Sequence, residues 1–180
     1  MTWVVLSNGK VFDFTKNTMP NVTPDVIAHS LANQCRFAGH TPSFYSVAEH
    51  SWRVMRLVGD SDAYAALMHD AHKSVIQDII RPLKTYDFKN FEAMVMGLFE
   101  DHFGYVIHQG VEAADSAILA AEFRHFFGRD LPDVELAKRG REALKSHGAM
   151  DNCMDPTIAK TVWLDAFGAL CPPRFSSEGD

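Results

Sequence analysis

Two short apolar-rich runs, Trp3–Leu6 and Val11–Phe14, lie on either side of Ser7-Asn8-Gly9-Lys10 near the start of the chain. An Asn-Gly pair between two such runs is the strongest short-range signal for a β-hairpin. Because two strands alone are only marginally stable in water, we expect this hairpin to pack against the rest of the fold.

The rest of the chain shows the apolar spacing of amphipathic helices. Thr23-Pro24 and the capping box Ser46-Val47-Ala48-Glu49 mark two helix starts, and Gly104 and Gly128 mark two helix ends. The expected helices begin at 24 and then cover 47–58, 61 to about 73, a short segment interrupted at Arg81-Pro82, 87–103, 111–127, 134–147 and 157–169. The sequence therefore predicts one mainly α-helical domain over residues 1–180, with a small N-terminal β-hairpin and a tail that frays from about residue 174.

Composition places the chain among ordinary globular proteins. It has 180 residues, of which 47% are hydrophobic and 22% charged, and a formal net charge of -6. These values exclude a disordered chain, and the acidic balance argues against a dedicated nucleic-acid binder. No apolar run approaches about 18 residues and no signal-peptide pattern is present, so no membrane association is expected. Three cysteines without a CxxC pattern indicate no disulfide framework and a cytoplasmic location.

Nine histidines are present, and one of them occurs in Leu67-Met68-His69-Asp70. An imidazole nitrogen and a carboxylate oxygen are suitable ligands for a divalent transition metal. Adjacent residues on a helix lie about 100° apart, so both side chains can reach one ion at the helix edge. The dipeptide alone is a weak signal, because a histidine on an apolar helix face is more often an ordinary core residue. However, the apolar residues before it place the pair where a buried charge would need a partner.

Two other residues could complete such a site. His50 lies beside the apolar stripe formed by Val47 and Val54, and Asp115 lies among small and apolar residues on a core-forming helix. Aspartate has low helix propensity and does not belong on a buried face without a counter-charge. Singly, each residue is better explained as an exposed polar position. Together with His69 and Asp70, they make a plausible four-ligand site for one metal ion.

These four residues resemble the pattern H…HD…D of the HD-domain metal-dependent phosphohydrolases, which lies on a helical core. Four segments of the first 130 residues or so occur in the order of one branch of that family: Cys35-Arg36-Phe37-Ala38-Gly39-His40, Phe44-Tyr45-Ser46-Val47-Ala48-Glu49-His50-Ser51, Ala66-Leu67-Met68-His69-Asp70-Ala71 and Gln77-Asp78-Ile79-Ile80-Arg81-Pro82-Leu83-Lys84. That branch contains the small bacterial and phage 5'-deoxynucleotidases and the related phage deoxynucleoside triphosphohydrolases. Several motifs in order are far more specific than one His-Asp pair.

The resemblance implies an HD-type helical bundle, a homo-oligomer and one divalent metal ion (Mn, Co, Zn, Mg, Fe or Ni). It implies these site residues: His50, His69, Asp70 and Asp115 as metal ligands, Arg36 and Lys84 facing the phosphate, Phe37 near the nucleoside, and Asp78 as a catalytic or supporting carboxylate. The expected reaction is removal of phosphate from (deoxy)nucleoside 5'-phosphates. One alternative is cleavage of a dNTP, for example dATP, to nucleoside and triphosphate. Another is a nucleotide-binding module that keeps the metal but has lost turnover.

The sequence departs from this family at Lys73, where a glutamate usually follows the metal-binding histidine by four residues. On a continuous helix, Lys73 lies about 40° from His69 and about 60° from Asp70, on the side of the ligands. An ammonium beside a metal dication is unfavourable unless an anion lies between them. We therefore expect substrate phosphate to partner Lys73, and Asp78 to do the work of the missing glutamate. Alternatively, Lys73 has a catalytic role and protonates the leaving oxygen, marks altered or weakened catalysis, or extends into solvent.

Overall fold

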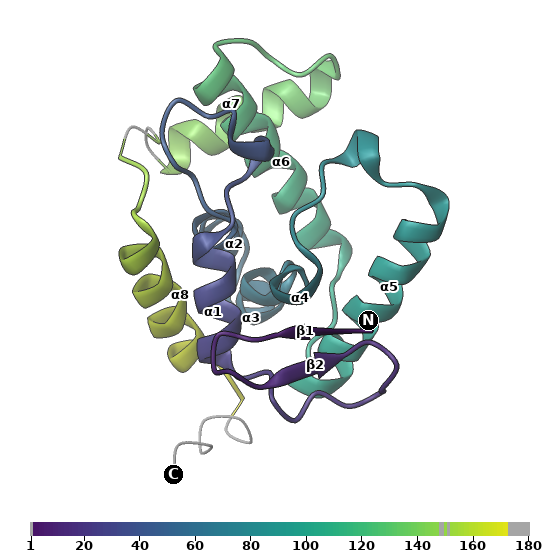
Figure 1. Cartoon of the computed structure of the whole chain (residues 1–180). Helices are drawn as coiled ribbons and strands as arrows, with labels where there is room; N and C mark the ends of the chain where they lie inside the picture. Colours follow the sequence, from purple (N-terminus) through teal and green to yellow (C-terminus); the bar gives the residue numbers. More distant parts are fainter. Residues whose placement is uncertain (1, 148–149, 151, 173–180) are drawn as a thin grey trace.

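The computed structural model describes residues 2–147, 150 and 152–172, and the predicted frayed tail lies outside this part. The elements, in chain order, are β1 (Trp3–Val5), β2 (Val11–Asp13), α1 (Pro24–Asn33), the 3-10 turn η1 (Phe37–Gly39), α2 (Val47–Leu57), α3 (Asp60–Met68), α4 (Lys73–Ile76), the 3-10 turn η2 (Arg81–Leu83), α5 (Tyr86–Phe103), α6 (Gln109–Phe127), α7 (Val134–His147) and α8 (Pro156–Leu170) (Figure 1). The predicted mainly α-helical fold with an N-terminal β-hairpin is confirmed.

The hairpin forms as its turn sequence indicates. β1 and β2 pair antiparallel with Val4 opposite Phe12, and Gly9 in the turn has a φ of 76°, which glycine adopts without steric cost. Phe12 is buried, and the ring of Phe14 lies 5.4 Å from that of Phe91 on α5. The hairpin therefore packs on the helical part, as a two-stranded unit must.

Local capping signals set several helix ends. The hydroxyl of Thr23 accepts a hydrogen bond from the Val26 amide at the start of α1, and Ser46 accepts one from the Glu49 amide at the start of α2. α5 and α6 end at Gly104 and Gly128, both in the left-handed conformation. These bonds satisfy backbone groups that a helix end leaves unpaired.

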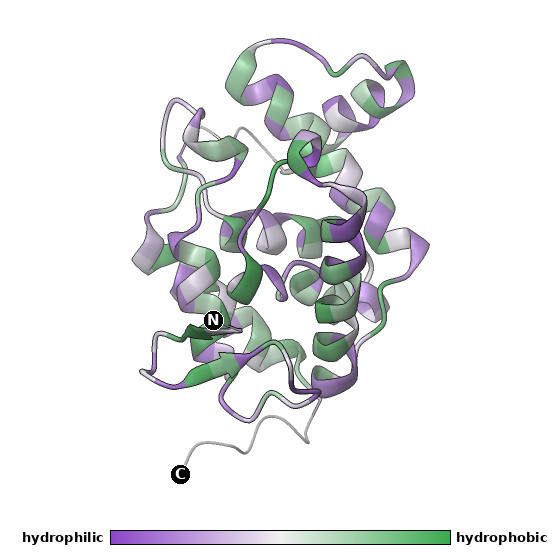
Figure 2. Cartoon of the chain, turned by 45° about the vertical axis from the view of Figure 1, so that its right-hand side comes forward, coloured by the Kyte–Doolittle hydropathy of each residue, from purple (hydrophilic) through white to green (hydrophobic). Residues whose placement is uncertain are grey.

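Helix α2 is the centre of the helical part and packs against α1, α3, α6 and α8. Around their axes the helices change from hydrophobic to hydrophilic, which is the pattern that buries one side of each (Figure 2). The buried side of α2 also carries charged groups. Glu49 is fully buried and accepts hydrogen bonds from Arg53 and from the amide of Met154, so it anchors the segment before α8 to α2.

The helix predicted over 61 to about 73 is interrupted. α3 ends at Met68, and α4 begins at Lys73 after a tight turn. In this turn the amide of Ala71 bonds to the carbonyl of Met68, and the amide of Lys73 bonds to that of Asp70, so three-residue spacing replaces the four-residue spacing of an α-helix. The prediction of a continuous helix is wrong at this point, and the angles drawn from it for Lys73 do not apply.

In the part of the chain that the structure describes, three residues other than glycine have a positive φ, and all lie beside residues that the sequence marks as functional. Phe37 and Ala38 follow Arg36 with φ of 53° and 51°, and Gln77 precedes Asp78 with φ 75° and ψ 161°. The Gln77 conformation is one that almost only glycine adopts. This strain fixes the direction in which the chain leaves α4.

Two structural observations bear on the predictions about disulfide bonds and membrane association. Among the described residues, which include Cys35, Cys153 and Cys171, no disulfide bond is formed. Within the described residues, no helix combines the length and apolar character that crossing a membrane requires.

Candidate active site

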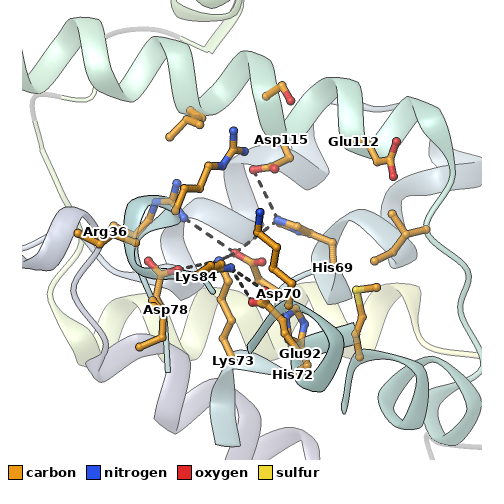
Figure 3. Close-up of a pocket in the computed structure, with 18 of the residues that line it drawn as sticks. Arg36, His69, Asp70, His72, Lys73, Asp78, Lys84, Glu92, Glu112 and Asp115 are labelled. Atoms are coloured by element: carbon orange, nitrogen blue, oxygen red, sulfur yellow. Dashed lines mark hydrogen bonds and ion pairs between the residues drawn. The ribbon is translucent and has the colours of Figure 1, made fainter. Parts of the chain in front are cut away.

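A cleft of about 1030 Å³ contains most of the residues that the sequence predicts to be functional. Its lining comes from the segment after α1, the turn after α3, the segment 78–84, α5 and α6. Figure 3 shows His69, Asp70 and Asp115 converging in this cleft, with Arg36, Lys73 and Asp78 beside them (Figure 3). Such a volume is at the upper end of the range of small-molecule sites.

The four predicted metal ligands come together from three parts of the chain. Potential ligand atoms of His50, His69 and Asp70 all lie within 4.8 Å of one another, and all three side chains are buried. Asp115 on α6 joins them, because its Oδ1 lies 3.0 Å from His50 Nε2 and 3.9 Å from His69 Nε2. Two imidazole nitrogens and two carboxylates are a donor set suited to a divalent transition metal.

In both imidazoles Nδ1 is engaged by an oxygen atom of the protein, which leaves Nε2 facing the cluster of candidate ligands. His50 Nδ1 lies 2.6 Å from Glu122 Oε1, and His69 Nδ1 lies 2.7 Å from the carbonyl oxygen of Ala66. A carbonyl or carboxylate oxygen only accepts, so Nδ1 carries the hydrogen in each ring. His50 Nε2 is buried and makes no well-aligned hydrogen bond within the described residues, although Asp115 Oδ1 lies 3.0 Å away. This orientation of two histidines is the one that metal sites use, and the residues present fit a metal ion.

The charges of the cluster keep its carboxylates ionised. Burial would raise the pKa of Asp70, but His69 and Lys73 outweigh it and hold that pKa well below its usual range. Burial and Arg36 would lower the pKa of His50, but Glu122 and Asp115 raise it to about 9. Burial lowers the pKa of His69, which favours its neutral form. At neutral pH a metal ion would therefore have to displace a proton from His50.

Glu122 is a central residue of this site that our sequence analysis missed. It is fully buried on α6, and its Oε1 accepts a hydrogen bond from the Tyr45 hydroxyl at 2.7 Å. Its Oε2 accepts two from Arg36, from Nε at 3.1 Å and from Nη2 at 3.0 Å. The signal was present, because Glu122 interrupts an apolar helix face just as Asp115 does.

Arg36 and Phe37, which the sequence predicts to contact substrate, both line the cleft. Arg36 is buried, and two of its three nitrogens bind Glu122. The third, Nη1, lies 3.9 Å from Asp70 Oδ2 and remains the one that faces the cluster. The ring of Phe37 lies under the Arg36 guanidinium and packs against Phe127.

Lys73 is buried between two carboxylates. Its Nζ lies 2.8 Å from Asp70 Oδ2 and 2.7 Å from Asp78 Oδ1. The premise that this lysine lacks an anionic partner is therefore wrong, as is the alternative that it extends into solvent. The structure brings Lys73 and Asp78 together with the cluster, as expected from the motif order, but it joins them by a direct ion pair.

Lys84 lines the same cleft and pairs with a second residue that the sequence analysis missed. Its Nζ lies 2.6 and 2.9 Å from the two carboxylate oxygens of Glu92 on α5. His72 Nε2 lies 3.6 Å from the same carboxylate. Partial burial would raise the pKa of Glu92, but His72 and Lys84 outweigh it and lower that pKa to about 2. This group of three forms a second charged cluster in the cleft.

Comparison with known proteins finds relatives of this chain for which no activity is stated. No family model matches the chain. The chain is 38% identical over 128 residues to the uncharacterized protein YfdR of Escherichia coli K12, a match that covers 69% of this chain and 72% of that protein. It is also 36% identical over 91 residues to an uncharacterized protein of Rhodobacter capsulatus, with 46% of each chain covered. From the extent of the first match, the chain belongs to the family of the Escherichia coli protein YfdR.

Proposed function

We propose that the protein is a metal-dependent phosphohydrolase that removes phosphate from (deoxy)nucleoside 5'-phosphates. One observation carries the proposal: two imidazole Nε2 atoms and two ionised carboxylates converge in a cleft that is also lined by buried cations. His50 Nε2 is buried and makes no well-aligned hydrogen bond within the described residues, and its near neighbour is the carboxylate oxygen of Asp115 at 3.0 Å, an arrangement that suits a metal ion shared by the two side chains. A metal ion held there would supply an electrophile for the phosphoryl oxygens and an acidified water.

The cations of the cleft suit the phosphate dianion. In this proposal, Arg36 Nη1 donates to a phosphoryl oxygen while Glu122 holds the rest of the guanidinium in place. Lys84 contacts the phosphate after exchanging its pair with Glu92, and Phe37 offers a ring for the nucleoside. Because Glu122 holds the Arg36 guanidinium in place before substrate arrives, this side chain loses little conformational entropy on binding.

Lys73 and Asp78 act as a pair in the proposed reaction. When the phosphate replaces Asp78 as the partner of Lys73, the Asp78 carboxylate is released to accept a proton from the attacking water. The ammonium then neutralises charge on the phosphate and keeps its contact with Asp70. In this proposal Lys73 therefore stands at the sequence position of the family's usual glutamate, but Asp78 accepts the proton.

Two other functions have one supporting observation each. The cleft volume of about 1030 Å³ leaves room beyond a single phosphate, which favours a dNTP triphosphohydrolase. The buried pairing of Lys73 with Asp70 and Asp78 neutralises carboxylates that catalysis would use, which favours a nucleotide-binding module without turnover.

A phosphate-release screen separates the three functions. The purified protein is incubated with dNMPs, NMPs and dNTPs, each with Mn²⁺, Co²⁺, Mg²⁺ or Zn²⁺, and the products are resolved by ion-exchange chromatography. Orthophosphate from monophosphates supports the nucleotidase, and triphosphate from dNTPs supports the alternative enzyme. Nucleotide and metal binding without either product supports the binding module. Asp70→Asn serves as the control against a contaminating phosphatase, and absence of metal binding by the wild type would refute the proposal.

A further inference from the structure

The carboxylate of Glu122 is completely buried and accepts four hydrogen bonds. It lies seven residues after Asp115 on α6, about two helical turns away and on the same face. Oε1 accepts from Tyr45 and from His50 Nδ1, whereas Oε2 accepts from Nε and Nη2 of Arg36. A buried carboxylate with this many donors is fixed in position, and it fixes its donors in turn.

We propose that Glu122 is the positioning residue of the metal centre, which forces His50 to present the lone pair of Nε2 to the ion. The inference rests on the metal site of the proposed function. An imidazole without a fixed partner can carry its hydrogen on either nitrogen, and only the ring with hydrogen on Nδ1 has a lone pair on Nε2. Glu122 Oε1, at 2.6 Å from Nδ1, has no hydrogen to donate and therefore keeps a hydrogen on that nitrogen. Asp115 Oδ1, 3.0 Å from Nε2, is itself a candidate metal ligand, so Nε2 is the nitrogen that gives up its hydrogen to the ion.

The substitution Glu122→Gln tests this logic because it keeps the shape of the side chain. If the amide nitrogen of glutamine took the place of Oε2, it would face two N–H groups of Arg36, which cannot accept. If it takes the place of Oε1, it faces Tyr45 and His50, which can both become acceptors. The second arrangement is favoured, and in it the hydrogen of His50 moves to Nε2, where it blocks the metal.

Tyr45→Phe is the matched control. It removes one of the two hydrogen bonds to Oε1 but leaves the carboxylate that selects the His50 tautomer. If Glu122 had a purely structural role, each of the two variants would lose metal affinity in proportion to its loss of stability. A positioning role predicts that only Glu122→Gln loses metal affinity.

The experiment measures Co²⁺ binding to wild type, Glu122→Gln and Tyr45→Phe by isothermal titration calorimetry, and the visible absorption of bound Co²⁺. We expect the dissociation constant of Glu122→Gln to rise roughly 10- to 100-fold and that of Tyr45→Phe to stay unchanged. Circular dichroism of the metal-free proteins verifies that each variant is folded. For the wild type loaded with Zn²⁺, long-range ¹H–¹⁵N NMR correlations of the imidazoles should show hydrogen on His50 Nδ1.

The outcomes separate this inference from the proposed function. Wild-type protein without Co²⁺ or Zn²⁺ binding would overturn both. Equal Co²⁺ affinity of wild type and Glu122→Gln would overturn the positioning role alone, as would an equal loss in Glu122→Gln and Tyr45→Phe. If Glu122→Gln does not fold, the NMR measurement decides, because a zinc ion bound through His50 Nδ1 would overturn the inference.

Discussion

Replacing Lys73 by methionine tests whether this lysine is a built-in counter-ion of the metal cluster. Its Nζ lies 2.8 Å from Asp70 Oδ2 and 2.7 Å from Asp78 Oδ1, and only 11% of its side chain is exposed. Methionine has similar length and no charge, so the variant removes the cation while it fills most of the space. Two carboxylates then face each other across the cleft without a positive charge between them.

The expected loss of stability follows from these contacts. Removing one partner of a buried ion pair costs roughly 3–5 kcal/mol, because the other charge stays buried. Water can reach Asp78, whose side chain is 14% exposed, so we expect a value near the lower end, about 3 kcal/mol. At about 2–4 °C per kcal/mol for a chain of this size, the metal-free Tm should fall by roughly 6–12 °C.

A divalent ion bound to Asp70 should replace much of the missing charge. We therefore expect added Mn²⁺ to raise the Tm of Lys73→Met by more than that of the wild type, since a ligand that binds only the folded state stabilises it. Calorimetry of chelator-treated and Mn²⁺-supplemented protein measures both shifts, and Lys73→Arg controls for the charge. A metal-free Tm within about 2 °C of wild type, or an equal Mn²⁺ shift in all three proteins, would contradict the counter-ion role.

Four further predictions follow from single residues. Asp70→Asn should lose most bound metal, since an amide lacks the charge that holds a dication, and equal metal by elemental analysis would exclude Asp70 as a ligand. Arg36→Ala should lower kcat/KM at least tenfold, or about 1.5 kcal/mol, so unchanged steady-state kinetics would rule out a phosphate contact. Gln77→Gly should stabilise the fold by about 1 kcal/mol, because relief of strain exceeds the added chain entropy, and a lower urea midpoint would refute this. Glu92 has a pKa lowered in the folded state from 4.5 to about 2, so it stabilises the fold above pH 4.5 and loses this effect as the pH falls toward 2. The difference in unfolding free energy between wild type and Glu92→Gln should therefore shrink over that interval, and a constant difference would argue against the ion pair.

Much of the fold is predictable because its determinants act within a few residues. Asn8-Gly9 specifies the hairpin turn, Ser46 caps the helix that it precedes, and Gly104 ends α5. Each signal works through backbone hydrogen bonds or allowed dihedral angles of its own neighbourhood. The break after Met68 carries no such signal, and the helix that the sequence predicts there continues too far.

The candidate metal ligands could also be predicted from the sequence, but from a signal other than local backbone preference. Asp115 is conspicuous because it interrupts an apolar helix face, where an ionised group needs a partner. Glu122 interrupts the same face and carries the same signal, but the sequence does not say which partner it has. A polar residue on a buried helix face indicates that it has hydrogen-bonding or ionic partners in the interior. The sequence does not identify those partners.

By itself, then, the sequence determines the hairpin, most of the helices and many of the polar residues that must meet in the interior. The tertiary structure alone decides which of them meet. It joins His50 to Glu122, 72 residues away, and closes the turn that sets Lys73 between Asp70 and Asp78. The reason is physical: helix propensity and capping depend on near neighbours, whereas the pairing of buried charges depends on how distant helices pack and on the need of each buried charge for a partner.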